Sequence, residues 1–178
     1  YWRDWEFRRV LFRSFAYWCE ERMRWYRDLG VPEDMLRLRQ HETDELSHYS
    51  AGTADVEFMY PWGWGELEGI ANRTDYDLRQ HAEFSGQDLS YFDQEQDRRY
   101  VPHVIEPAAG ADRATLAFLL AAYAEEQVET ASGKTETRTV LRLDPRLAPI
   151  KVAVLPLSKH EQLVPVSDEL AEIGRAHV

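Results

Sequence analysis

The feature that most constrains the fold of this chain is a run of alternating residues followed by a turn. Residues 53–60 alternate alanine, valine, phenylalanine and tyrosine with threonine, aspartate, glutamate and methionine. Such alternation is typical of a strand with one buried face. Residues 61–65 contain a proline and two glycines, which favour a turn, and residues 66–71 predict a second strand. The sequence therefore predicts a β-hairpin.

Further elements are predicted on both sides of this hairpin. Aromatic and apolar residues at helical spacing predict a helix over residues 15–29. An alanine- and leucine-rich segment predicts a buried helix over residues 111–126. The other predictions are a short helix or turn over 33–39, a helix over 76–85, a polar loop over 86–98, a strand over 100–106, a strand over 150–157 and a helix over 159–171.

The 178 residues suffice for one domain, or for one domain and a piece of another. Residues 15–128 are predicted to form the first domain, and polar residues around Gly133 predict a linker over 129–137. The strand and helix expected after the linker cannot bury a core of their own. Residues 138–171 are therefore predicted to be the start of a truncated α/β domain.

The two ends of the chain differ in character from the rest. Residues 1–14 and 172–178 resemble translated sequencing-adapter read-through, and we expect both segments to be non-native. An ordinary amphipathic N-terminal helix is the alternative for residues 1–14. We expect the chain to be a fragment of a longer protein.

The composition excludes several classes of protein. A hydrophobic content of 44% with 12% aromatic residues excludes disorder throughout, and no apolar run approaches the roughly 20 residues of a membrane span. The single cysteine, Cys19, excludes an internal disulfide and favours a reducing cytoplasm. A net charge of -11 argues against DNA binding and against non-specific binding of any nucleic acid.

Two acidic residues in the second predicted strand are candidates for cation binding. Glu66 and Glu68 lie two positions apart, so we expect both side chains to project from one face. Neighbouring carboxylates are costly to bury unless a cation or metal ion joins them. A solvated strand face is the alternative. With Trp62 and Trp64 nearby, a glycosidase site built on paired acids is a second alternative.

Arg73 follows this strand, and two aspartates come soon after it. Its guanidinium could clamp a phosphate or a carboxylate, because its planar geometry suits bidentate anion binding. A structural ion pair with Asp75 or Asp77 is the alternative.

A third candidate region combines an acid, a glycine and a helix start. Glu106 ends a predicted strand, Gly110 permits a sharp turn, and a helix opens near Arg113. Backbone N–H groups and the positive end of that helix are then expected beside the Glu106 carboxylate. Arg113 is poorly placed to stabilise the helix dipole, so it could instead stack on a nucleobase.

Residues 41–48 contain histidines and acids that could bind a metal ion. The zinc-protease motif needs two histidines four positions apart, whereas the histidines here are seven apart. A polar surface segment is the favoured interpretation. A zinc site would have to draw on His41, Glu42, Asp44, Glu45 and His48.

Several long strings of the sequence resemble the glycyl-tRNA synthetase family. They include WGELEGIANRTDYDL at 64–78, VPHVIEP at 101–107 and RTVLRLDPRLAP at 138–149. The similarity covers residues 15–171 and points to the bacterial, single-chain, homodimeric type, a class II aminoacyl-tRNA synthetase. It implies an α+β fold, with an antiparallel sheet and helices, followed by the beginning of an anticodon-binding domain. It also implies ATP-dependent, Mg²⁺-assisted activation of glycine and its transfer to tRNA(Gly) in the cytoplasm.

The resemblance assigns roles to individual residues. Glu66 and Leu67 match an ATP-contacting pair, and Glu66 could also hold Mg²⁺. The glycine-contacting stretch corresponds to Glu106, Pro107, Ala108, Ala109 and Gly110, with Glu106 bound to the substrate ammonium. The ATP-contacting end of the third class II motif corresponds to Gly110, Ala111, Asp112 and Arg113. The resemblance makes Glu66 and Arg113 the candidate catalytic residues, and Glu68 and Arg73 are given supporting roles.

The sequence departs from the family pattern in two ways. Ala108 stands where many members carry serine, so a hydroxyl is missing beside the glycine, and backbone groups could substitute for it. The second class II motif, whose arginine would clamp the α-phosphate, is absent, as are the first motif and most of the anticodon-binding domain. We expect the parent enzyme to be active and this chain alone to be inactive. A non-catalytic, nucleotide-binding paralogue with the same fold is the alternative.

Overall fold

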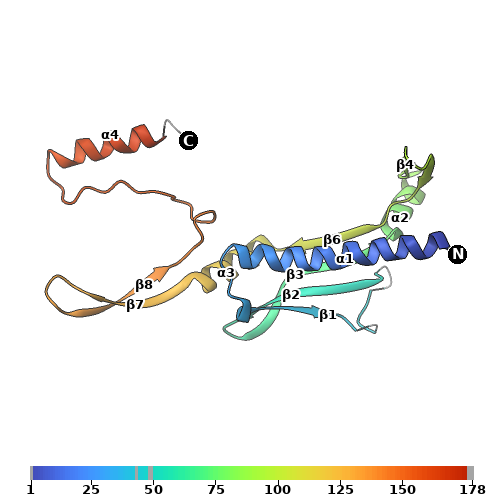
Figure 1. Ribbon diagram of the computed structural model, residues 1–178, viewed down its shortest axis with the longest axis horizontal. Helices are drawn as coiled ribbons and strands as arrows, with labels where there is room; N and C mark the ends of the chain where they lie inside the picture. The colour runs from blue at the N-terminus through green and yellow to red at the C-terminus, as the bar shows by residue number, and fades with distance from the viewer. Residues whose placement is uncertain (1, 43, 48–49, 176–178) are drawn as a thin grey trace. The chain divides into compact units, whose positions relative to one another are not determined.

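The computed structural model describes residues 2–42, 44–47 and 50–175 (Figure 1). The chain divides after Arg142 into two compact units. The first unit contains a four-stranded antiparallel sheet with helices, so the predicted α+β class is confirmed. None of the described helices has both the length and the apolar character needed to cross a membrane.

The sheet has the strand order β1-β2-β3-β6, and neighbouring strands are antiparallel. Its strands are β1 (Leu36–Gln40), β2 (Gly52–Tyr60), β3 (Gly63–Thr74) and β6 (Val104–Ala109). Strands β2 and β3 are the predicted hairpin. The alternation that predicted β2 is confirmed, because its alanine, valine, phenylalanine and tyrosine side chains are all buried.

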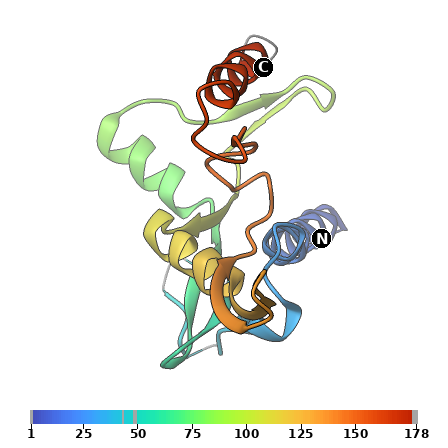
Figure 2. The same ribbon diagram turned by 90° about the vertical axis from the view of Figure 1, so that its left-hand side faces the viewer.

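Helix α1 (Trp2–Asp28) runs along one face of this sheet (Figures 1 and 2). The core between them includes Tyr26 of α1, together with Phe58 and Ile70 of the sheet. Helix α3 (Ala111–Ala122) joins this core through Phe118, whose ring centroid lies 5.7 Å from that of Trp25. Aromatic contacts of this kind stabilise beyond the area that they bury.

The pairing of β2 with β3 is interrupted by a β-bulge. Val56 pairs with Glu68, but the next residue, Glu57, pairs with Glu66, so Leu67 is an extra residue in β3. A bulge shifts the alternation of side chains along the strand that carries it. Glu68 is 1% exposed and faces α1, whereas the Glu66 side chain is 56% exposed. The prediction that these two carboxylates share one face is therefore wrong.

Glu68 is held in the core by two groups of α1. Its Oε1 accepts a hydrogen bond from Arg22 Nε at 2.6 Å, and its Oε2 accepts one from Tyr26 Oη at 2.8 Å. Burial, together with the hydrogen bond to Glu68, raises the pKa of Tyr26. A buried carboxylate is tolerated only when it is paired in this way.

The first elements differ from their predicted bounds. Helix α1 begins at Trp2 rather than at residue 15. The predicted short helix over 33–39 is only a 3-10 turn at Glu33–Met35, after which the chain enters β1. Leu36 is buried and pairs with Phe58, so the sheet overrides the local preference.

The segment between β3 and β6 contains more structure than predicted. Helix α2 (Tyr76–Ser85) has the predicted bounds. The predicted polar loop contains β4 (Tyr91–Asp93), which pairs with β5 (Arg98–Tyr100) in a small hairpin. The third predicted strand begins at Val104 rather than at residue 100. This strand, β6, contains Pro107, and it tolerates the missing N–H because it is an edge strand.

The structure after α3 also differs from the prediction. Helix α3 ends at Ala122 and is buried only at Ala117, Phe118 and Ala122, so the expectation of burial on nearly all sides is wrong. Residues 123–141 form a hairpin of β7 (Tyr123–Glu129) and β8 (Thr135–Leu141), which occupies the predicted linker. The sheet-type alternation of burial along β7 explains why the helix does not continue.

In the second unit, helix α4 (Leu163–Arg175) corresponds to the helix predicted over 159–171. Residues 150–157 form no strand with any described residue, so the strand predicted there is wrong. Most of their apolar side chains are exposed, with Leu157 at 97%. An extended segment needs a partner for its backbone groups to become a strand, which a lone apolar run cannot supply.

The central position of Ile70 gives a test of this core. We expect Ile70→Ala to lower the free energy of unfolding by about 2–5 kcal/mol, because it leaves a cavity between α1 and the sheet. The measurement is urea unfolding followed by circular dichroism. Leu157→Ala is the control, with an expected change within about 0.5 kcal/mol. Equal effects of the two substitutions would contradict the assignment of this core.

Candidate functional site

The sheet carries a pocket of about 290 Å³ on the face opposite to the α1 core. Two rows of residues in register across β2, β3 and β6 line it: Asp55–Gly69–Ala108 and Thr53–Ala71–Glu106. In the middle of each row stands a residue with little or no side chain, flanked by a carboxylate on one side. The floor of the pocket is therefore formed by small residues, and its walls carry carboxylates.

Arg73 lies at one end of this pocket and is bound to two carboxylates. Its guanidinium donates to Glu106 Oε2 at 2.9 Å and to Asp77 Oδ1 at 3.0 Å. These bonds raise the pKa of Arg73 and lower the pKa of Asp77. The structure thus places the predicted ion pair on Asp77 and adds Glu106 to it, while Asp75 pairs with Arg79. Arg73 fixes the direction of the Glu106 side chain.

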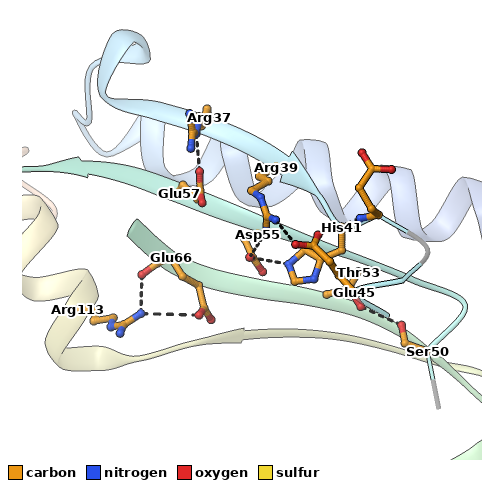
Figure 3. A network of polar contacts seen from close by, with 11 residues as sticks. Arg37, Arg39, His41, Glu45, Ser50, Thr53, Asp55, Glu57, Glu66 and Arg113 are labelled. Carbon is orange, nitrogen blue, oxygen red and sulfur yellow. Dashed lines mark hydrogen bonds and ion pairs between the residues drawn. The ribbon is translucent and has the colours of Figure 1, made fainter. Parts of the chain in front are cut away.

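The start of α3 lies beside Glu66. Arg113 Nη1 donates to the backbone oxygen of Glu66 at 2.7 Å and lies 3.9 Å from its Oε2 (Figure 3). Gly110 precedes the helix with φ -82, an ordinary extended conformation, so the predicted sharp turn does not use the freedom of glycine. Ala111 and Asp112 occupy the exposed first turn of the helix.

The predicted site residues separate into two groups. Glu66, Arg73, Glu106 and Ala108 line the pocket, and Arg113 lies against the first of them. The other predicted residues do not line it. Glu68 faces α1, Leu67 is buried in the bulge, and Pro107 is in register with the buried Ile70, while Gly110, Ala111 and Asp112 lie at the start of α3. Ala109 ends β6 opposite Glu68.

The pocket also contains Asp55, which sequence analysis did not select, and His41, which it considered only as a zinc ligand. Asp55 accepts a hydrogen bond from His41, with 2.7 Å between Oδ2 and Nε2 (Figure 3). Arg39 lies 3.8 Å from the same carboxylate but only 2.6 Å from Glu45. The available signal was the alternation of β2, which turns Asp55 away from the buried face.

The zinc hypothesis for residues 41–48 gains no support from the geometry. His41 and Glu45 do line the pocket, whereas His48 lies outside the described residues. Within the described part of the chain, no group of three or more histidine, cysteine, aspartate or glutamate side chains could hold a metal ion. Any Mg²⁺ bound at Glu66 would have to take most of its ligands from a phosphate substrate and water.

The chain was compared with protein-family models and with curated proteins. No family model matches the chain. It is 58% identical over 162 residues to a glycine–tRNA ligase of Streptomyces coelicolor, an alignment that covers 89% of this chain and 35% of that protein. The identity is 56% over 158 residues to the enzyme of Thermobifida fusca and 54% over 164 residues to that of Nocardia farcinica.

The chain is homologous to part of glycine–tRNA ligase. It spans about a third of the length of the curated relatives that it matches. The resemblance predicted from the sequence is confirmed. Of the pocket residues, Glu66 and Arg73 belong to the string at 64–78 and Glu106 belongs to the string at 101–107, two of the strings on which that resemblance was based.

The Arg73 bridge can be tested through its acidic partner. We expect Arg73→Gln to raise the pKa of Asp77 towards its ordinary value of 3.8, because the hydrogen bonds that stabilise its charged form are lost. The contribution of this pair to the stability of the folded chain is fully present at pH values above the ordinary pKa of Asp77. It is lost as the pH falls through the lowered pKa of Asp77 in the folded chain. An NMR titration of the Asp77 carboxyl measures the shift.

Arg79→Gln is the matched control, because Arg79 pairs with Asp75 at the same helical spacing. It should leave the pKa of Asp77 unchanged. An unaltered Asp77 titration in Arg73→Gln would show that the bridge does not form in solution.

Proposed function

We propose that this chain is part of the catalytic region of a glycine–tRNA ligase with a class II synthetase fold. The parent protein would activate glycine with ATP and transfer it to tRNA(Gly). The observation that carries the proposal is the acidic pocket with a floor of small residues. The sequence that forms it is 54–58% identical to three glycine–tRNA ligases.

The pocket suits the chemistry of the smallest amino acid. An ammonium group is stabilised by carboxylates that are fixed in direction, and Glu106 is fixed by Arg73. Gly69, Ala71 and Ala108 leave the floor between the carboxylates free of bulky side chains. Since Ala108 lacks a hydroxyl, the backbone of residues 106–110 would provide the remaining polar contacts to glycine.

ATP would bind next to the glycine, between Glu66 and the start of α3. Arg113 is held beside Glu66 by a hydrogen bond, and its side chain is largely exposed, so its guanidinium can face adenine or the triphosphate. The N–H groups of the first turn, at residues 110–113, add a positive dipole end. Glu66 would supply a carboxylate oxygen to the Mg²⁺ that accompanies ATP.

The proposed reaction has two steps. A carboxylate oxygen of glycine attacks the α-phosphate, pyrophosphate leaves, and glycyl-adenylate forms. A tRNA hydroxyl then attacks the glycyl carbonyl, and AMP leaves. The residues of this chain would orient the glycine and hold one side of the ATP, which lowers the barrier by positioning the reactants. We place the homodimeric parent enzyme in the cytoplasm.

A glycosidase built on Glu66 and Glu68 is disfavoured by the geometry. Such enzymes need two carboxylates that flank one bond of the sugar. Glu68 is instead buried against α1 and bound by Arg22 and Tyr26. A non-catalytic paralogue is distinguished from the ligase only by measuring the reaction.

The test uses a chimaera, because the chain spans about a third of its relatives. This chain replaces the matching segment of the Streptomyces coelicolor enzyme, and ATP–pyrophosphate exchange is measured. We expect exchange with glycine and none with alanine, and a loss of at least about 100-fold in kcat/KM for Glu106→Ala, since the ammonium loses its charged partner. A folded chimaera without glycine-dependent exchange would refute the ligase and favour the paralogue.

A further inference from the structure

We propose that Asp55 is a further acceptor for the substrate ammonium group, and that His41 is the residue that positions it. The inference rests on the proposed function and deepens it. It assigns a direct contact to a strand residue of β2 and a positioning role to a histidine just beyond the end of β1.

The two oxygens of Asp55 have different environments. The side chain is 13% exposed, and its Oδ2 accepts the hydrogen bond from His41. Its Oδ1 is directed over Gly69, 3.9 Å from the point where a Cβ atom of residue 69 would stand. One oxygen is therefore anchored, and the other faces the floor of the pocket.

Glu66 approaches the same point from β3. Its Oε1 lies 3.6 Å from the Cβ position of residue 69, so two carboxylate oxygens from different strands lie within 4 Å of one point. Converging negative charges repel unless a cation lies between them. The absence of a side chain at Gly69 leaves that space for a small cationic group such as an ammonium.

Two neighbouring arginines form only long ion pairs with these carboxylates. Arg39 is engaged by Glu45 at 2.6 Å and stays 3.8 Å from Asp55. Arg113 lies 3.9 Å from Glu66 Oε2, whereas the oxygen of Glu66 that lies beside Gly69 is Oε1. Arg73 is occupied by Glu106 and Asp77. The substrate ammonium would provide the positive charge.

His41 is held firmly enough to serve as an anchor. Its backbone N–H donates to Thr53 O at 2.9 Å, which extends the β1–β2 pairing by one residue beyond Gln40. The ring therefore lies beside Asp55 from the next strand. A hydrogen bond to Oδ2 keeps the carboxylate from turning away and leaves Oδ1 for the ligand.

The experiment is glycine-dependent ATP–pyrophosphate exchange by the chimaera, with KM measured separately for glycine and ATP. We expect Asp55→Asn to raise KM for glycine by about tenfold or more, since an ammonium loses a charged acceptor, with KM for ATP within about twofold. His41→Ala should raise KM for glycine several-fold. His41→Gln, whose amide can still donate to Oδ2, should restore it.

Two further variants separate binding from folding. Gly69→Ala places a methyl group between the two carboxylates and should also raise KM for glycine by about tenfold. Glu57→Gln is the matched control, because Glu57 is paired with Arg37 in the same strand pair but does not line the pocket. It should leave both KM values unchanged.

The outcomes are distinct. The inference would be overturned if Asp55→Asn kept a KM for glycine within about twofold of that of the parent chimaera. If Asp55→Asn does not fold, the same result in Gly69→Ala would overturn it. Either result would leave the proposed ligase function unaffected. An equal rise in both KM values, or no rescue by His41→Gln, would overturn the positioning role. A parent chimaera without exchange would refute the proposed function, and this inference with it.

Discussion

The pocket and the core of the first unit both depend on the β-bulge at Leu67. Without the extra residue, regular alternation would put Glu66 and Glu68 on the same side of β3. The bulge directs the first towards the pocket and the second towards α1, where Arg22 and Tyr26 bind it. Because of this one inserted residue, Glu66 is accessible to a ligand in the pocket, whereas Glu68 is buried in the core. Bulges often lie next to functional sites for this reason.

The second determinant is the register of the strands on the pocket face. Antiparallel pairing places Asp55 beside Gly69 and Glu106 beside Ala71, so carboxylates alternate with small residues across the sheet. Basic side chains of neighbouring strands fix these acids: Arg73 binds Glu106, and His41 binds Asp55. Anchoring of one oxygen per carboxylate fixes the direction of the other, which is the condition for selective recognition of a small cation. We regard this arrangement as the physical basis of the proposed preference for glycine.

Much of this could be predicted from the sequence. The alternation of residues 53–60 predicted β2, and the family resemblance selected four of the residues that line the pocket: Glu66, Arg73, Glu106 and Ala108. The bulge could not be predicted, because period-two alternation has no signal for one extra residue. Asp55 was missed, and His41 was considered only as a zinc ligand, because their proximity results from strand pairing between β1 and β2, which lies outside any local motif. Strand β1 and the hairpin over residues 123–141 were missed because tertiary pairing overrides local preference.

The most direct test of the central claim compares two matched substitutions, Glu66→Gln and Glu68→Gln, in equilibrium unfolding of this chain. The account predicts that Glu68→Gln lowers the unfolding midpoint clearly, because the half-buried Arg22 loses its buried counter-charge. Glu66→Gln should leave the midpoint nearly unchanged, since its side chain is exposed to the pocket. Equal destabilisation by both substitutions would contradict the division of these two acids between the faces of the sheet.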